Sequence, residues 1–369
     1  MSKEFLIPSG FKDEVTFNAY VEHQYKNKII DYFKLNGFDL VKTPLIEYKD
    51  KLNKNNFFIQ NKKLEEELQI RNDITPQIIR VVSSRFTNRK MPIKLCYYGE
   101  VVRKSGSMLR PERQFLQVGA ETIGSDKVEA DIEIINIAYQ CLSIIGIKNI
   151  TIELSSRIFL DKIFNTIKNK KDILKIYKLI TTKDLESSLA LLDNKNRNFI
   201  KNIFSCTGSF NKIKHKLSLL NVDEKTRDEI NRIRKIADKL KLKYGDKLYI
   251  DFSELNEKNY HNGIRFTFFA KNVRGEIASG GRYHINNNSI DETATGFTCY
   301  MDSIIRASSF ANISKKILIP FNASDSIKNK LQKNGYTIFA IFEDFKPIKS
   351  KAKKYGCSYY LDNQKIKSA

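Results

Sequence analysis

The segment at residues 95–124, LCYYGEVVRKSGSMLRPERQFLQVGAETIG, contains two strand-like stretches joined by a basic, polar loop. Aromatic and β-branched residues fill the first stretch, and the second alternates apolar with polar side chains, so the pattern predicts a β-hairpin. Gln117 and Glu121 are four residues apart and therefore share one face of the second strand. With Arg103 at the end of the first strand, they suit a small zwitterionic ligand. The alternative is a solvated sheet face beside a charged loop.

The second strand also contains a string with a close counterpart in known proteins. Residues 113–121 read RQFLQVGAE, which resembles the R-E-F-x-Q-x-G-x-E string of motif 2 in class II aminoacyl-tRNA synthetases, in the form used by histidyl-tRNA synthetases. Gln114 replaces the family's glutamate, and the other specified positions match. The resemblance implies an α+β fold, built on an antiparallel sheet flanked by helices.

A second stretch, Arg71-Asn72-Asp73-Ile74-Thr75, resembles the L-R-P-E-x-T string of the same family, with Asp73 in place of glutamate. The resemblance implies that Asp73 and Thr75 line the site for the amino group of histidine, where a carboxylate facing an ammonium is the expected pairing. The alternative is local, with Asp73 or Thr75 as the cap of a helix that has Pro76 in its first turn. Both interpretations can hold together, because a capped helix start often borders a pocket.

Residues 8–50 begin with a turn, after which apolar residues recur at helical spacing over 15–35 and predict a long amphipathic helix. Asn36-Gly37 provides a favourable end for this helix. Residues 38–48 then read as one strand that contains Pro44, which suits a sheet edge or an interface. The order of helix, glycine, strand and proline resembles motif 1 of class II synthetases. That resemblance implies a dimer of this chain with itself through the 8–50 region.

The middle of the chain predicts a change of architecture. Residues 127–149 predict a helix and 150–156 a strand, but 157–247 are rich in Lys and Asn, with Ile and Leu at helical spacing and no strand-like alternation. We expect an all-helical insertion there, in which no chemistry is visible. Histidyl-tRNA synthetases also carry a helical insertion, so the resemblance implies a synthetase-like core of residues 1–156 and 248–312 that the insertion interrupts.

One departure from the family falls on residues 256–263, which correspond to its R-G-L-D-Y-Y-T-G string. Tyr260 is kept as a candidate pocket residue, whereas Asn256 stands in place of the arginine that the family uses in activating histidine. His261 replaces the second tyrosine. No Ser, Cys or metal ligand is spaced to support His261 as a catalytic base, so we predict no catalytic role for it.

A second departure concerns the nucleotide. Residues 279–283, SGGRY, match the family's G-G-R-Y string, and residues 295–307 resemble motif 3, a strand that runs into a helix. The family has G-x-G-x-E-R-L there, and its arginine grips the ATP γ-phosphate. Tyr300 stands at the second glycine, where it would crowd the nucleotide, and Ser303 stands at the arginine. Arg306, one helical turn further on, would have to reach back, so we expect no replacement for the lost cation.

The end of the chain, residues 313–369, alternates strand-like and helical patterns and predicts a small parallel α/β unit. It resembles a shortened anticodon-binding domain and is too short to be a complete one. The truncation independently argues against tRNA recognition.

Composition sets the remaining bounds. The chain has 369 residues, enough for two or three domains. Its net charge of +22 comes mostly from Lys spread along the sequence beside abundant Asn and Ile, which base-composition bias explains better than RNA binding does. Five scattered cysteines without a C-x-x-C pair indicate reduced thiols in the cytoplasm and neither disulfides nor a metal site. The sequence shows no signal peptide and no apolar run long enough for a membrane span.

The kept and lost residues together resemble a second branch of the family, the regulatory subunits of ATP phosphoribosyltransferase. The resemblance implies no catalytic residue, no cofactor, and a hetero-oligomer with the short catalytic subunit, which condenses ATP with phosphoribosyl pyrophosphate in the first step of histidine biosynthesis. It also implies activation of that partner and a contribution to histidine feedback. The pocket could sense histidine, or it could be inherited architecture without a ligand. The candidate ligand-binding residues are Asp73, Thr75, Arg103, Gln117, Glu121 and Tyr260.

Two other functions stay open on the sequence. A divergent but active histidyl-tRNA synthetase would form histidyl-adenylate from ATP. A non-catalytic relative that binds RNA would show an affinity for tRNA that falls steeply with salt.

Overall fold

The computed structural model of the protein describes residues 6–49, 56–59, 67–86, 89–156, 158–253, 261–287, 290–308, 315–343, 346–363 and 365–369. The chain forms two compact units, Met1–Ser309 and Phe310–Ala369. Of the helices in the described ranges, none is long and apolar enough to cross a membrane.

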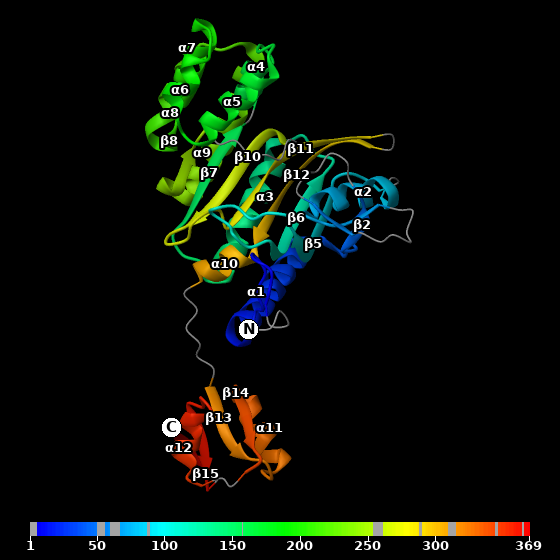
Figure 1. Cartoon of the computed structure of the whole chain (residues 1–369), viewed down its shortest axis with the longest axis vertical. Helices are drawn as coiled ribbons and strands as arrows, with labels where there is room; N and C mark the ends of the chain where they lie inside the picture. Colours follow the sequence, from blue (N-terminus) through cyan, green and yellow to red (C-terminus); the bar gives the residue numbers. More distant parts are fainter. Residues whose placement is uncertain are drawn as a thin grey trace. The chain divides into compact units, whose positions relative to one another are not determined.

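The first unit is built on a nine-stranded sheet in the order β1-β5-β6-β12-β11-β10-β7-β9-β8 (Figure 1). The pairs from β5 through to β7 are antiparallel, whereas β1 with β5 and β7 with β9 are parallel. In sheet order the strands are Asp39–Val41, Ile93–Val102, Gln114–Ile123, Ile290–Tyr300, Ala278–Asn287, His261–Ala270, Ile150–Ser156, Leu248–Ile250 and Gly208–Ser209. The predicted antiparallel sheet flanked by helices is therefore confirmed.

Strands β5 and β6 form the predicted hairpin, in which Gly99 pairs with Gln117. Side chains of β6 alternate between two cores, because Val118 belongs to one and Phe115 to the other. Gln117 and Glu121 are on the same face of the strand as Phe115. The hairpin therefore presents both polar residues to the side of the sheet that carries Phe115.

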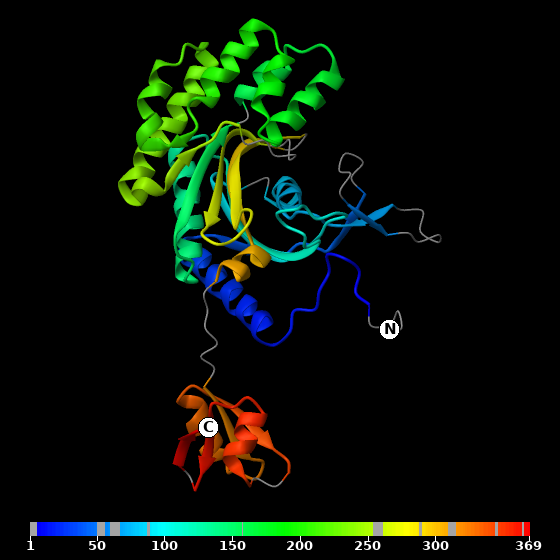
Figure 2. The same cartoon turned by 60° about the vertical axis from the view of Figure 1, so that its left-hand side comes forward.

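Helices cover the two faces of the sheet differently. Helices α1 (Thr16–Leu35) and α3 (Val128–Ile144) lie on one side and α2 (Thr75–Arg85) lies on the other, as Figure 2 shows. The predicted end of the first helix is confirmed, because α1 stops before Asn36 and Gly37 has a φ of 81°. Since Phe115 packs with the apolar residues of α2, Gln117 and Glu121 face the same helix.

The chain after α1 does not form the single strand expected over residues 38–48. Strand β1 belongs to the large sheet, whereas β2 (Ile46–Tyr48) belongs to a small sheet with β4 (Leu68–Ile70) and β3 (Phe57–Ile59). The break is held by polar contacts around Pro44. Gln77 Nε2 donates to the Pro44 carbonyl at 3.0 Å, and Arg71 Nη1 donates to the carbonyl of Thr43 at 2.9 Å.

The start of α2 also differs from the local alternative in which Asp73 or Thr75 caps the helix. The N-cap residue is Ile74, and no side chain caps it. Asp73 Oδ1 accepts a hydrogen bond from the backbone N–H of Ile74 at 3.0 Å, whereas the Thr75 hydroxyl is directed at the sheet. Asp73 therefore contacts the backbone at the helix start without capping the helix, and Thr75 contacts the sheet.

The predicted insertion is helical, and Figure 1 shows most of its helices gathered at one end of the sheet. The prediction missed β8, which lies within the insertion and pairs with β9. Aspartates cap several of the helices, including Asp193 and Asp223, whose carboxylates accept backbone hydrogen bonds. The helices are α4 (Ile158–Phe164), α5 (Lys170–Thr181), α6 (Leu185–Ala190), α7 (Asn194–Phe204), α8 (Phe210–Leu219) and α9 (Glu224–Tyr244), followed by the short η2 (Gly245–Lys247).

A buried carboxylate ties the insertion to the sheet. Asp131 of α3 is fully buried and forms ion pairs with Arg232 of α9 and Arg282 of β11, each at 2.9 Å. Thr295 of β12 donates to the same carboxylate at 2.7 Å. One side chain thus joins two helices and two strands that are distant in the sequence.

The second unit is the small α/β structure expected from the sequence. Strands β13 (Lys315–Pro320), β14 (Tyr336–Ile341) and β15 (Tyr359–Asp362) are parallel, in the order β14-β13-β15. Helices α11 (Asp325–Lys333) and α12 (Ile348–Lys354) connect them. The sequence did not reveal β16 (Lys365–Ser368), which adds an antiparallel strand beside β15.

Candidate amino-acid site

The candidate site lies where the start of α2 meets β6. The backbone N–H of Ile74 donates to Gln117 Oε1 at 3.2 Å, and Thr75 Oγ1 donates to Glu121 Oε1 at 3.1 Å. Asp73, which precedes them, is 6% exposed. The fold thus brings Asp73, Thr75, Gln117 and Glu121 together from two segments separated by more than forty residues.

Glu121 is the centre of a buried hydrogen-bond network. It is 1% exposed, and the hydroxyls of Tyr97 and Tyr283 donate to its two oxygens at 3.4 Å and 3.0 Å. Burial raises the pKa of Glu121 to about 8, and the nearby Asp73 carboxylate acts in the same direction, against the hydrogen bonds from Tyr283 and Thr75. This pKa favours the protonated form of Glu121 at neutral pH.

A glycine makes room for this carboxyl group. Gly296 of β12 pairs with Glu121 in the sheet register, and a Cβ atom at position 296 would lie 1.5 Å from Glu121 Oε2. Any larger residue would displace the glutamate side chain. The hydrogen-bonded position of Glu121 thus depends on a glycine of the neighbouring strand β12.

Gln117 supplies an unused donor. Its side chain is fully buried and its Oε1 atom is bonded to Ile74, but its Nε2 atom has no hydrogen-bond partner within the described residues. A buried amide donor without a partner is costly unless a ligand or water completes it. This atom is the feature of the site that points most directly to a polar ligand.

The other two candidate residues are placed differently. The guanidinium of Arg103 lies 4.8 Å from the ring centre of Phe115, at the loop end of the hairpin. Phe115 in turn makes an edge contact with Tyr300, with ring centres 6.1 Å apart. Tyr260, together with Asn256, lies outside the described residues.

Next to this site is a charged cluster that the sequence interpretation missed. The sequence predicted a basic, polar loop and assigned Arg110 no role, whereas Arg110 is only 4% exposed. Its guanidinium lies 3.8 Å from the ring centre of Tyr300 and pairs with Glu276 at 3.3 Å and Asp302 at 3.4 Å. The acidic partners are 166 and 192 residues away in the chain, so no local pattern could reveal them.

Arg306 reaches back along its helix toward Ser303. In α10 (Met301–Ala307), its Nη2 atom donates to Ser303 Oγ at 3.0 Å. The same guanidinium pairs with Glu112 and, at 3.4 Å, with Asp302. The cation is therefore beside the motif position that Ser303 occupies, but two carboxylates already neutralise it.

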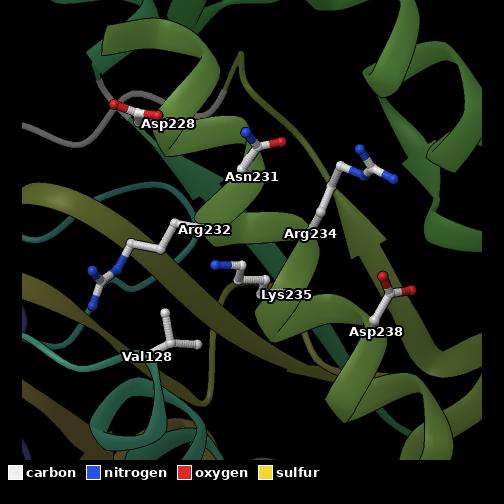
Figure 3. A pocket seen from close by; sticks show the side chains of 7 residues that line it. All are labelled: Val128, Asp228, Asn231, Arg232, Arg234, Lys235 and Asp238. Atoms are coloured by element: carbon white, nitrogen blue, oxygen red, sulfur yellow. The ribbon is translucent and has the colours of Figure 1, made fainter. Parts of the chain in front are cut away.

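A hollow of about 500 Å³ lies elsewhere, on α9 near the start of α3. Figure 3 shows Arg232 and Lys235 on one side of α9 and Arg234 directed to the other. Arg232 is already paired with Asp131, and Asp228 and Asp238 supply opposing charge. In the part of the chain that the structure describes, no group of three His, Cys, Asp or Glu side chains could hold a metal ion.

The sheet, its hairpin and the buried polar cluster between α2 and β6 define a protein of the class II aminoacyl-tRNA synthetase type. A family model described as histidyl-tRNA synthetase matches residues 10–304. Among solved structures, a protein from Bacillus halodurans titled ATP phosphoribosyltransferase regulatory subunit/histidyl-tRNA synthetase is similar, with a TM-score of 0.79, 19% identity and 97% of each chain covered. Histidyl-tRNA synthetase from Nostoc has a TM-score of 0.78 and 17% identity, covering 97% of this chain and 91% of its own.

The names of curated relatives show to which branch of this family the chain belongs. The ATP phosphoribosyltransferase regulatory subunit of Rhodospirillum centenum is 27% identical over 96% of this chain and 94% of its own length. The protein of the same name from Clostridium novyi is 30% identical over 81% of this chain and 75% of its own. The chain therefore belongs to the histidyl-tRNA synthetase family and, within it, to the ATP phosphoribosyltransferase regulatory subunits.

Proposed function

We propose that this chain acts in the cytoplasm as a non-catalytic subunit that binds and activates the short catalytic subunit of ATP phosphoribosyltransferase, in the first step of histidine biosynthesis. We further propose that its buried pocket binds histidine and transmits feedback. The names of the relatives support the partner, and the geometry of the pocket and of the adjoining cluster supports the division of roles.

The observation that carries the non-catalytic role is the filled space beside the pocket. In the synthetases that the chain resembles, motif 3 faces the nucleotide. In this chain, the Arg110 guanidinium lies 3.8 Å from the ring centre of Tyr300, beside motif 3, and it forms ion pairs with Asp302 and Glu276. ATP would have to displace a buried ion pair and meet two carboxylates. Each preorganised cation missing from a reacting phosphate costs about 10²–10³-fold in rate, so the loss at Asn256 and Ser303 adds to the obstruction.

The pocket has groups that match histidine. Asp73 supplies a carboxylate for the ammonium, and the free Nε2 donor of Gln117 suits the ligand's carboxylate. Glu121 holds a proton that it can share with a ring nitrogen, because burial raises its pKa to about 8. Arg103 and Tyr260 complete the proposed set. A histidine bound here can regulate the partner only if it binds the active and inactive conformations with different affinity.

The experiment measures ATP phosphoribosyltransferase activity of the short catalytic subunit with and without this chain. We expect the rate to rise severalfold and the two chains to co-elute from a sizing column. No stimulation together with no co-elution would refute the regulatory role. Histidine-dependent exchange of pyrophosphate into ATP would then reveal an active synthetase, the alternative that the named relatives disfavour.

The pocket is tested on the assembled complex. We expect Gln117→Ala to raise the histidine concentration for half-inhibition by about tenfold or more, since a hydrogen bond to a charged group is worth roughly 1.5–3 kcal/mol. Gln332→Ala, on exposed surface of α11, is the matched control and should leave inhibition unchanged. Unaltered inhibition of the Gln117→Ala complex would place the histidine site elsewhere and leave the activating role intact.

A further inference from the structure

The loop of the central hairpin ends in an ordered turn that exposes apolar side chains. This tip turn, residues 104–109, is closed by a hydrogen bond from the Ser107 N–H to the Arg110 carbonyl at 2.7 Å. The Arg110 N–H donates back to Ser107 Oγ at 3.0 Å. Between them, Met108 is 99% exposed and Leu109 is 55% exposed.

Contacts of the residues that flank the turn hold it in place. After the turn, the buried Arg110 guanidinium is fixed by Tyr300, Glu276 and Asp302, as described above, and the Arg113 N–H donates to the carbonyl of Gly10 at 2.7 Å. Before the turn, the Arg103 N–H donates to the Arg113 carbonyl at 2.7 Å. The turn is therefore anchored to the body of the unit at its base and is not a loosely attached loop.

The backbone fits closely around the turn. A Cβ atom on Gly106 would lie 2.4 Å from the Pro111 carbonyl oxygen, and one on Gly275 would lie 3.4 Å from Leu109 Cβ. Gly275, with a φ of 79°, belongs to the connection between β10 and β11. That connection therefore packs against the tip turn and supports Leu109 from the side.

The exposed charged residues of the tip turn and of the supporting connection are basic. Lys104 in the tip turn is exposed, as are Lys271 and Arg274 in the supporting connection. Residues 104–109 and 271–275 contain no Asp or Glu. An apolar point within a positively charged rim is complementary to an apolar pocket with an acidic rim on another protein.

We propose that the tip turn is a contact through which this chain holds its catalytic subunit, with Met108 and Leu109 entering an apolar pocket that acidic residues surround. The inference rests on the proposed function. A turn that is ordered before binding loses little conformational entropy on association, and an unbranched methionine adapts to the shape of a pocket. An RNA ligand would use the basic rim but would have no need of an exposed methionine, so a protein partner is favoured.

The test compares binding of full-length variants to the short catalytic subunit by isothermal titration calorimetry. We expect the double variant Met108→Ser with Leu109→Ser to bind about tenfold or more weakly, as central apolar contacts do when removed. The double variant Leu174→Ser with Leu242→Ser changes residues that are 69% and 85% exposed on other helices, and it should bind as the unmodified chain does. A second variant, Lys104→Glu with Arg274→Glu, should weaken binding most at low salt.

The outcomes are distinguishable. If the unmodified chain neither binds nor activates the catalytic subunit, the proposed function fails and this inference fails with it. If the unmodified chain binds and the Met108 and Leu109 double variant binds within about twofold of it, a difference below 0.5 kcal/mol, only this inference is refuted. If the double variant still binds the catalytic subunit but loses a salt-sensitive binding of tRNA, the tip turn is an RNA contact, and this inference is likewise refuted.

Discussion

At the scale of single residues, Glu121 shows how a motif position acquires its chemistry. Three hydroxyl groups and a tightly fitted glycine surround a carboxyl group from which water is excluded. The unfolded chain would release the proton near pH 4.5, whereas the folded chain keeps it to about pH 8. The free energy of unfolding therefore falls as pH rises across that interval, by an amount on the order of a few kcal/mol.

This fall in the free energy of unfolding with rising pH leads to a prediction for Glu121→Gln. The amide resembles the protonated acid in shape and has no proton to lose, so the variant should lack the part of the pH dependence that Glu121 contributes. Urea unfolding at pH 5 and pH 8 should show the variant gaining stability relative to the unmodified chain at the higher pH. An identical difference between the two proteins at both pH values would contradict it. Thr226→Ser, buried but not ionisable, serves as the control.

The sequence predicted that Gln117 and Glu121 share one face of a strand, but it did not predict which residues surround them. Gln117 and Glu121 were assigned to one face because a strand alternates with period two, and that rule needs no tertiary information. The close approach of Gly296 and the role of Arg110 depend on segments far away in the chain. The local sequence is compatible with two roles for Asp73 and Thr75, as ligand-binding residues or as helix caps. Only the structure of the α2 start, packed on β6, shows that neither caps the helix.

At the scale of elements, the helical insertion was predictable and its attachment was not. Repeated Ile and Leu at helical spacing indicated helices, but a two-residue strand such as β8 leaves no periodic trace. The attachment relies on Asp131, a buried acid that the sequence of α3 shows only as one of several charged residues. Asp131 links the elements because it forms ion pairs with Arg232 of α9 and Arg282 of β11.

We predict that Asp131→Asn destabilises the first unit by about 3–5 kcal/mol, because it leaves two arginines near a neutral group in a buried place. The urea midpoint of the first unit measures the change. The control is Asp228→Asn on the exposed side of α9, for which we expect less than about 0.5 kcal/mol. Equal midpoints for the two variants would show that the ion pairs are compensated by other contacts.

At the scale of the whole molecule, exposed apolar side chains recur among the described residues between 6 and 58, on or next to α1, β1 and the small sheet. Exposed apolar side chains that are contiguous mark an interaction surface. The resemblance to motif 1 predicts a dimer interface in the same region. The exposed residues include Val15, Tyr20, Leu35, Leu40, Ile46, Tyr48 and Phe58.

We therefore predict that the chain sediments as a dimer in analytical ultracentrifugation. The double variant Leu40→Lys with Tyr48→Lys should shift it to monomers at micromolar concentration, because each lysine would need to be buried without a partner. The variant Leu242→Lys, which changes an exposed leucine of α9 outside the region, should remain dimeric. A monomeric unmodified chain would remove the dimer from the proposed assembly without affecting the amino-acid pocket.

The two ends of the large sheet have a consequence for this assembly. β1 has three residues and β8 has two, so the nine-stranded sheet stops at each side in a strand too short to recruit another chain through backbone hydrogen bonds. Uncontrolled stacking of sheets edge to edge is thereby blocked at both margins. If the chain joins one copy of itself and a different protein, as proposed, the margins of this sheet favour partners that bind through side-chain surfaces.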